Sequence, residues 1–552
     1  MKLIDAFGKY QNLIIVIAVL ATGLLSGGIS WQYLIVPNIL LMLYLSGSNI
    51  KKVKFNYTII LIVSILISGI VSISLTSADK QNAIHEFMKI IIFALAFCAG
   101  MTADKKTIFN AICVLGTVLS VTGILGYCNI LRIDEFVFND RTYFRLQSFV
   151  KYANVTAILL GISYFVLLDE YKETKKIYIP HISACILLSI YLTISKAAIP
   201  IFLLVGTAEV ILNKKYAKYF FLQNIICLIV AFGVILAVRN HYYSISALTV
   251  VACIAITGTL SKNSMPFNAD LKKFRPAIVL IAVIGIICAS IYAASIDVFA
   301  TLVSRLVYSK DAMRIIKSDW LFGIGAGGWK YYQYGVQSIG YNVNYVHNGM
   351  IQLWLDYGLF GFVAFVAIFI TGAINAFKKK EYVLFGIIIF ITAHSMIDID
   401  LSFGVILIVY GLIAGFIAKD GKQDFCFKPF IAIVLIICVL FETYSVCDYM
   451  IRADFENNYL NNDYKAALKS AYRLEKICPL DSNLKVSIGS LDPNKTEINL
   501  EKAAALSPLD KNICLKYINY QIDNKRQINI SELSAKFINL APKQESTYVQ
   551  EQ

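Results

Sequence analysis

The chain alternates between long apolar runs and short polar segments along most of its length. About 20 successive apolar residues cross the hydrocarbon core of a bilayer as an α-helix, whereas barrel strands are shorter and alternate in polarity. The runs lie near residues 11–28, 31–49, 57–76, 84–101, 108–129, 152–169, 178–195, 197–212, 219–238, 243–260, 277–297, 350–375, 382–396, 401–418 and 429–447. We therefore expect an all-α, polytopic membrane protein with about 14–15 transmembrane helices.

Lysine-rich segments indicate how these helices are oriented. They are KKVK at 51–54, DKK at 104–106, YKETKK at 171–176, NKKYAK at 213–218, KKFR at 272–275 and KKK at 378–380. With the expected spans, all of them fall on one side of the membrane, which the positive-inside rule makes the cytoplasm. The segment 130–151, the long loop at 298–349 and the chain after about 447 then lie on the extracytoplasmic side.

The pattern divides the chain into a transmembrane domain, 1–447, and a polar tail, 448–552. Two tail segments, 463–483 and 497–512, each combine a helical pattern with a Pro-Leu-Asp turn. This arrangement resembles tetratricopeptide-type hairpins, although the turns are about 29 residues apart rather than the usual 34. We expect an extracytoplasmic helical-repeat domain that serves as a docking surface, including for a possible protein partner.

Composition supports a membrane protein and argues against several other classes. Hydrophobic residues make up 58% of the chain, charged residues 16%, and the mean hydropathy is +0.66. The net charge of +14 is explained by the cytoplasmic loops, and no motif suggests a nucleic-acid partner. The 12 cysteines include no CxxC pair, so the sequence has no zinc or redox motif; Cys478 and Cys514 lie in the polar tail and could pair, although the sequence gives no strong reason that they do.

Polar residues whose side chains could bind a substrate or take part in catalysis gather on the expected outer face. They are Arg141, Arg145, Lys196, Arg305, Arg314, Lys330, His347, His394, Asp398 and Asp400. Arginine binds phosphate oxygens in a bidentate fork, and a neighbouring histidine can remove a proton from a hydroxyl. The set therefore fits glycosyl transfer from a lipid diphosphate, whose growing charge arginine stabilises.

Simpler interpretations of the same residues stay open. His347 would cap a helix or lie at the interface, Arg305 would anchor its segment there, and Lys196 would snorkel to the headgroups. If the chain is helical between them, His394 and Asp398 share a helix face and fix each other.

The long loop at 298–349 has two notable parts. Residues 304–319 could form a helix along the membrane surface, with Leu306, Met313 and Ile316 on its apolar side. The following GIGAGGW, 323–329, is either a plain turn or a segment whose backbone amides approach an anionic ligand.

Residues 301–366 resemble the signature region of the O-antigen ligase and polymerase family. The matching elements are SR at 304–305, GIGAGGW, and HN at 347–348 followed by Asp356, Gly358 and Gly361. The flanking segments FRLQSFVKYAN at 144–154, TISKAA at 193–198 and HSMIDIDLSF at 394–403 extend the similarity. The family usually has glutamate at the position of Asp356 and arginine at that of Lys196, which weakens the case for phosphate binding by Lys196.

The resemblance implies an enzyme that takes a glycan from undecaprenyl diphosphate on the outer leaflet of the cell membrane. It transfers the glycan to a hydroxyl of a glycan, lipid or protein acceptor, with inversion and without a metal or cofactor. His347 would activate the acceptor, and Arg305 and Arg145 would hold the diphosphate. Further candidates for substrate binding are Arg141, Lys196, Arg314, Asn348, His394 and Asp398.

Other functions remain possible. A ligase and a polysaccharide polymerase of this family share the same motifs. A polysaccharide or lipid transporter would predict inverted repeats and ionisable groups at mid-membrane. A membrane scaffold that presents the tail would leave His347 and Arg305 dispensable.

Overall fold

The computed structural model describes residues 2–47, 57–140, 143–213, 217–262, 298–419 and 428–524. Each expected span in these ranges forms a helix, and the span expected at 277–297 lies outside them. The helices before the long loop are α1 (Lys2–Leu24), α2 (Ile35–Gly47), α3 (Tyr57–Leu75), α4 (Lys80–Thr102), α5 (Lys105–Tyr127), α6 (Ala153–Thr174), α7 (Ile179–Leu192), α8 (Ala198–Asn213), α9 (Ala217–Arg239) and α10 (Tyr243–Lys262). Those from the loop onward are α12 (Val298–Asp319), α13 (Trp329–Val336), α14 (Gly349–Lys378), α15 (Tyr382–Ser395), α16 (Gly404–Ala418) and α17 (Lys428–Leu460).

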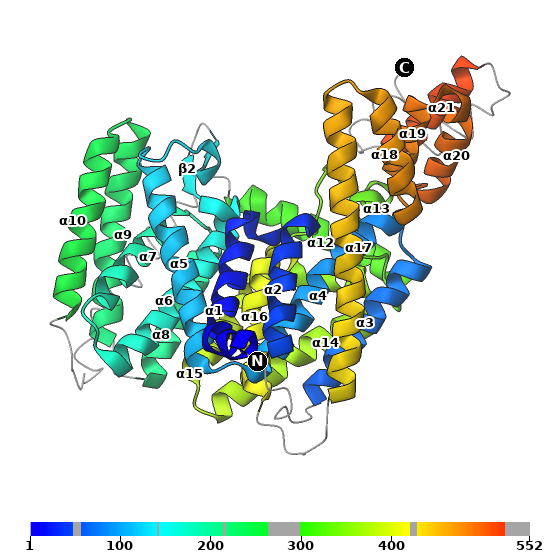
Figure 1. Cartoon of the computed structure of the whole chain (residues 1–552). Coiled ribbons are helices and arrows are strands. Elements are labelled where there is room, and N and C mark those ends of the chain that lie inside the picture. Colours follow the sequence, from blue (N-terminus) through cyan, green and yellow to red (C-terminus); the bar gives the residue numbers. More distant parts are fainter. Residues whose placement is uncertain are drawn as a thin grey trace.

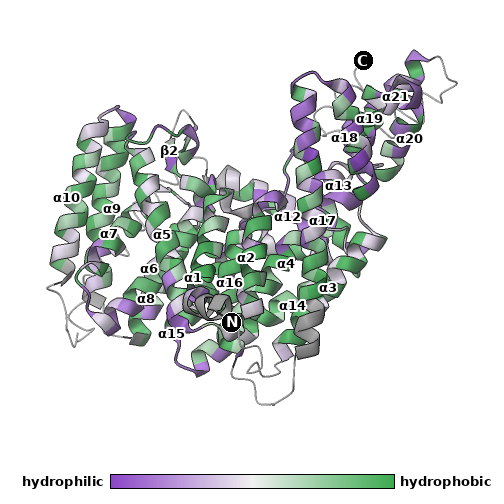
Figure 2. Cartoon of the chain, viewed as in Figure 1, coloured by the Kyte–Doolittle hydropathy of each residue, from purple (hydrophilic) through white to green (hydrophobic). Residues whose placement is uncertain are grey.

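Helix length and composition agree with a multi-pass membrane protein. Among the described residues, seven helices are long and apolar enough to cross a membrane: α3, α4, α5, α6, α9, α10 and α14. Several shorter apolar helices pack with them. Figure 2 shows hydrophobic residues along the bundle and hydrophilic residues at the helix ends and over the tail.

The centre of the bundle is formed by α4 and α16, which pack against each other more extensively than any other pair among the described helices. Aromatic rings join them to α14. Phe93 of α4 stacks on Phe365 of α14 at 5.0 Å and on Tyr410 of α16 at 5.8 Å, measured between ring centroids. Such contacts add to the energy of burial and fix the relative positions of the helices that carry the site.

Three of the lysine-rich segments lie at the same end of the bundle. Lys105, at the start of α5, pairs with Asp169 near the end of α6 at 3.1 Å and with Glu381 before α15 at 2.7 Å. The lysine-rich segments at 104–106, 171–176 and 378–380 therefore meet at one end, which we call the lysine end. The starts of α6 and α14 and the end of α15 lie at the opposite end.

The opposite end carries short irregular elements. Strands β1 (Val137–Asp140) and β2 (Tyr143–Leu146) form an antiparallel hairpin in register Phe138↔Arg145, a small addition to the expected all-α fold. The helix expected at 304–319 is present within α12. Ile316 is buried, whereas Leu306 and Met313 are exposed, so these three side chains do not share one environment.

The tail is helical over its described residues, which end at Asn524. It continues α17 into α18 (Tyr464–Ile477), α19 (Ser482–Leu491), α20 (Thr496–Leu506) and α21 (Lys511–Asp523), which rise from the bundle beside the upper part of α17 (Figure 1). Each Pro-Leu-Asp turn places its aspartate, Asp481 or Asp510, as the N-cap of the next helix. Cys478 and Cys514 are free thiols. The similarity to tetratricopeptide hairpins stays a prediction.

Candidate functional site

A fully buried carboxylate, Asp398, joins side chains from distant parts of the chain. It lies in the loop after α15 and has no solvent-exposed surface. Its Oδ1 accepts hydrogen bonds from the Tyr152 hydroxyl at 2.8 Å and from the Ile399 amide at 2.8 Å. Its Oδ2 accepts from Nδ2 of Asn154 at 2.5 Å and from Arg305 at 3.2 Å. A buried carboxylate needs such donors to remain ionised.

Arg305 reaches Asp398 from α12. One terminal nitrogen of its guanidinium contacts the carboxylate and the other donates to the carbonyl of Ile397 at 2.6 Å. The side chain keeps 19% of its surface exposed. Arg305 is thus fixed to the loop after α15 while part of it stays accessible.

His347 lies on the other side of the same carboxylate. Its Nδ1 is 3.5 Å from Oδ1 of Asp398, and 23% of the side chain is exposed. The residue has a positive φ of 56°, which turns the chain just before α14 begins. Asn348 then caps α14 by accepting from the amides of Met350 and Ile351.

A backbone hydrogen bond fixes this arrangement. The amide of Gly349 donates to the carbonyl of Asp398 at 3.1 Å, which ties the start of α14 to the loop after α15. The position of His347 relative to Asp398 therefore depends on main-chain geometry as well as on side-chain contacts.

Arg145 joins the cluster through Asn154. Its guanidinium donates to Oδ1 of Asn154 at 2.6 Å and to the carbonyl of Thr193 at 3.0 Å. The hydroxyl of Ser195 donates to the same Asn154 oxygen at 2.9 Å. Asn154 therefore links Arg145 and the α7–α8 junction to the carboxylate of Asp398.

The charges around Asp398 favour its ionised form. Burial alone would raise its pKa, but the neighbouring His347 imidazole and the positive charge of Arg305 hold the pKa of Asp398 well below its usual range. The surroundings therefore favour the negative form of the carboxylate, which is hydrogen-bonded to Arg305 and lies 3.5 Å from Nδ1 of His347.

A second buried pair lies close by in the sequence. Nδ1 of His394 is 2.6 Å from Oδ2 of Asp400, and both side chains are fully buried. The suggested pairing of His394 with Asp398 is wrong, because α15 ends at Ser395 and the four-residue helical spacing does not continue. His394 has no exposed surface from which to contact a substrate.

The remaining candidates differ in position. Arg314 pairs with Asp311 at 3.1 Å and donates to the carbonyl of Val336, so it does not join the Asp398 cluster. Lys196 is half-buried and directly follows Ser195, at the edge of the cluster. Arg141 lies outside the described residues.

The GIGAGGW segment is buried and serves packing. A Cβ on Gly323, which has a φ of +72°, would lie 2.3 Å from the carbonyl oxygen of Leu355. A Cβ on Gly358, where α14 is kinked, would lie 2.2 Å from the carbonyl oxygen of Leu321. The glycines thus let the loop and α14 approach closely, which favours a structural turn over amides open to an anion.

Several members of the cluster were absent from our predicted site: Tyr152, Asn154 and Ser195. Asn154 ends the FRLQSFVKYAN segment and Ser195 lies in TISKAA, so the flanking motifs did contain a signal for these two. Nothing in the sequence separates Tyr152 from the many other tyrosines of the chain.

The cluster places the partly exposed imidazole of His347 beside the buried carboxylate of Asp398. It also contains two arginines: one contacts the carboxylate directly, and the other is linked to it through Asn154. Such groups can accept a proton and stabilise an anionic leaving group. Among the described residues, no group of three His, Cys, Asp or Glu side chains could hold a metal ion.

Comparison with known proteins agrees with this chemistry. No curated protein matches the chain. Residues 181–366 match the family model described as O-antigen ligase, a range that includes Lys196, Arg305 and His347 but neither Arg145 nor Asp398. The resemblance found in the sequence is thereby confirmed for this part of the chain. The protein is a multi-pass membrane protein that matches the O-antigen ligase family over residues 181–366.

Proposed function

We propose that the protein is an O-antigen ligase-like glycosyltransferase that moves a glycan from undecaprenyl diphosphate to an acceptor hydroxyl. The observation that carries this proposal is the shared contact of Arg305 and His347 with the buried carboxylate of Asp398. The family match over residues 181–366 supports the same reaction class.

In the proposed reaction, His347 acts as the general base. Because its Nδ1 faces Asp398, its Nε2 is the nitrogen that takes the proton of the acceptor hydroxyl. The acceptor oxygen then forms a bond to the anomeric carbon as the bond from that carbon to the diphosphate oxygen breaks. A single displacement of this kind inverts the anomeric centre, and the proton on His347 passes to the departing diphosphate or to water.

Asp398 is a positioning residue in this scheme. It orients the imidazole and stabilises the imidazolium that forms when the acceptor is deprotonated. Arg305 and Arg145 hold the diphosphate and stabilise its charge as it leaves. Arg305 is already fixed through its contacts with Ile397 and Asp398, so little of its conformational entropy remains to be lost when the diphosphate binds.

The proposal includes an orientation. If the lysine end faces the cytoplasm, as the positive-inside rule requires, then the Asp398 cluster and the tail face outward. The substrates would be the lipid-linked glycan in the outer leaflet and a glycan, lipid or protein acceptor that meets it there.

The proposal is tested in the native host with His347→Ala and Arg305→Ala. Matched controls are His241→Ala and Arg239→Ala. Like His347, His241 has a positive φ and lies just before a helix, and both His241 and Arg239 are exposed. Surface glycan and the pool of lipid-linked glycan are measured in cells with equal amounts of inserted protein.

Loss of surface glycan with accumulation of lipid-linked glycan in both site variants, and in neither control, is the expected result. Long chains in that pool indicate a ligase, and single repeating units indicate a polymerase. Normal surface glycan in both site variants would exclude the proposed chemistry.

A further inference from the structure

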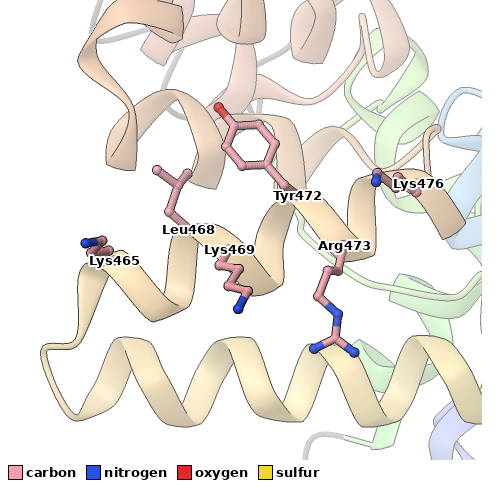
Figure 3. A pocket seen from close by; sticks show the side chains of 6 residues that line it. All are labelled: Lys465, Leu468, Lys469, Tyr472, Arg473 and Lys476. Atoms are coloured by element: carbon pink, nitrogen blue, oxygen red, sulfur yellow. The ribbon is translucent and has the colours of Figure 1, made fainter.

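One face of α18 in the tail carries a row of basic side chains. Figure 3 shows the hollow on this helix, which has a volume of about 430 Å³ and is lined by Lys465, Leu468, Lys469, Tyr472, Arg473 and Lys476. The cations follow one another at spacings of three or four residues, so they lie on one face of the helix over about 16 Å. We call Lys465, Lys469, Arg473 and Lys476 the basic ladder.

The positive charge of the basic ladder is hardly neutralised. In the described part of the chain no carboxylate pairs with Lys465, Lys469 or Lys476, and all three are exposed. Arg473 has only a loose contact with Asp454, at 4.0 Å between two well-exposed side chains. The acidic residue of α18, Glu475, pairs with Lys485 of α19 instead.

Two other cations of the tail, Arg452 and Lys485, are paired with carboxylates. Arg452 of α17 pairs with Asp448 and with Asp481, each at 2.8 Å. Lys485 pairs with Glu475, as above. The tail thus compensates the cations that hold its helices together and leaves those of the basic ladder available for an anion.

The direction of the basic ladder argues against a lipid surface as its ligand. A short turn joins α17 to α18, so α18 runs back antiparallel to α17, and the two helices pack side by side (Figure 1). Because α17 begins as an apolar helix in the bundle and continues beyond it, the basic ladder runs along the length of the bundle helices. A surface that binds headgroups would instead spread its cations in the plane of the membrane.

The other lining residues indicate what kind of anion fits. Leu468 and Tyr472 add apolar area to the lining of the hollow, which a small inorganic anion does not need and a sugar ring can cover. The Tyr472 ring also carries the ammonium of Lys495, 4.7 Å from its centroid, and its hydroxyl donates to Asp492 at 2.6 Å, so one charge of each sign lies at this point of the surface. A chain with repeated charges can contact several cations of the ladder at once.

The tail is attached close to the elements at the end of the bundle that carries the Asp398 cluster, opposite the lysine end. Gln81, in the first turn of α4, donates to the Tyr444 hydroxyl of α17 at 2.7 Å, and His85 contacts Asp448 at 2.7 Å. The same turn of α4 binds the long loop, since Lys330 of α13 donates to Asn82 at 2.8 Å. The tail and the loop that leads to His347 therefore share one support.

We propose that the basic ladder of α18 binds an anionic glycan, a polysaccharide that bears carboxylate or phosphate groups, and guides it along the tail. This rests on the proposed function in that the bound chain is the donor or acceptor glycan of the transfer reaction. The bound length of glycan would lie along α18, outside the site that contains His347.

The experiment measures binding to the purified full-length protein in lipid nanodiscs made of phosphatidylcholine alone. The probe is fluorescent polygalacturonate, with neutral dextran of the same length as the uncharged comparison. The ladder variant is Lys465→Gln, Lys469→Gln and Lys476→Gln. The matched variant removes three cations of α20 and α21: Lys502→Gln, Lys511→Gln and Lys516→Gln.

We expect binding of polygalacturonate to the wild type and the matched variant, weakening as salt rises, and about tenfold weaker binding to the ladder variant, since each exposed charge contributes modestly. A second variant with arginine at the three ladder lysines keeps the charge and should bind as the wild type does. Equal binding by the ladder variant and the wild type overturns the proposal.

Two further measurements distinguish a glycan on the basic ladder from a lipid ligand and from binding at the His347 site. In the first, the nanodiscs are mixed with vesicles that contain phosphatidylglycerol. If the vesicles capture the wild type but not the ladder variant, and the ladder variant still binds polygalacturonate, then the basic ladder binds lipid and the proposal is overturned. His347→Ala must leave polygalacturonate binding unchanged if the basic ladder is a separate site. Failure of the ladder leaves the transfer reaction untouched, because that reaction is measured independently by surface glycan.

Discussion

Replacement of Asp398 by asparagine changes one atom of a side chain on which the whole site depends. The Oδ1 position receives donors from Tyr152 and Ile399, and the Oδ2 position receives donors from Asn154 and Arg305. An amide has a single acceptor oxygen, so in either orientation its NH2 group faces two donors. The variant therefore loses a charge and also places donors against each other in a buried space.

The expected magnitude follows from burial. Removing one partner of a buried ion pair costs about 3–5 kcal/mol, because Arg305, only 19% exposed, keeps its charge without its carboxylate. For a chain of this size such a loss lowers the melting temperature by about 3 °C. Transfer should fall by about 10⁴-fold, the loss expected when the carboxylate that orients a catalytic histidine becomes an amide.

The assay combines tryptophan-fluorescence melting of the purified protein with measurement of lipid-linked and surface glycan in the host. Asp319→Asn, at a half-exposed carboxylate of α12, is the control and should change neither quantity. The double variant Asp398→Asn with Arg305→Gln removes both charges and should recover most of the melting temperature without recovering transfer. If Asp398→Asn alone melts and transfers as the wild type does, the carboxylate does not organise the site.

Three further changes have defined outcomes. Tyr152→Phe removes one hydrogen bond to the charged Asp398 and should reduce transfer about tenfold at normal protein levels, as measured by surface glycan. Gly323→Ala forces a Cβ to within 2.3 Å of a carbonyl oxygen at a φ of +72° and should lower the melting temperature and the amount of inserted protein. Asp481→Ala removes the N-cap of α19 and the bond to Arg452, and should speed trypsin cleavage of the tail while transfer stays intact.

Matched variants make these outcomes specific. Gly233→Ala in α9 adds a Cβ that meets nothing within 4 Å, so it should be tolerated where Gly323→Ala is not. Asp463→Ala removes only the N-cap of α18, so it should speed trypsin cleavage less than Asp481→Ala does. The difference between the two variants measures what the pair of Asp481 with Arg452 contributes. Unchanged transfer in Tyr152→Phe would remove that hydroxyl from the site.

Helix positions could be predicted from the sequence because their cause is local. A run of apolar residues long enough to cross a bilayer satisfies its own backbone hydrogen bonds, whichever neighbours it has. The Pro-Leu-Asp turns were predictable for the same reason, since Asp481 and Asp510 cap helices that begin just after them.

The partners of the site residues depend on tertiary packing and could not be derived from spacing. Four-residue spacing suggested His394 for Asp398, but the end of α15 at Ser395 left Asp398 free to meet Arg305, which lies 93 positions away in the sequence. Likewise, GIGAGGW is equally compatible with an open anion-binding turn and with a close-packed one. Only the nearness of Leu355 to Gly323 decides between them.

The balance of charge at the cluster explains why a carboxylate at its centre is compatible with an anionic substrate. Asp398 pairs with Arg305, and Arg145 is linked to the same carboxylate through Asn154. The N-termini of α6 and α14, where backbone amides lack helical partners, lie at the same end and add partial positive charge. The charge of Asp398 is therefore compensated by Arg305 within the cluster, and the two helix N-termini contribute partial positive charge that the proposed diphosphate would meet.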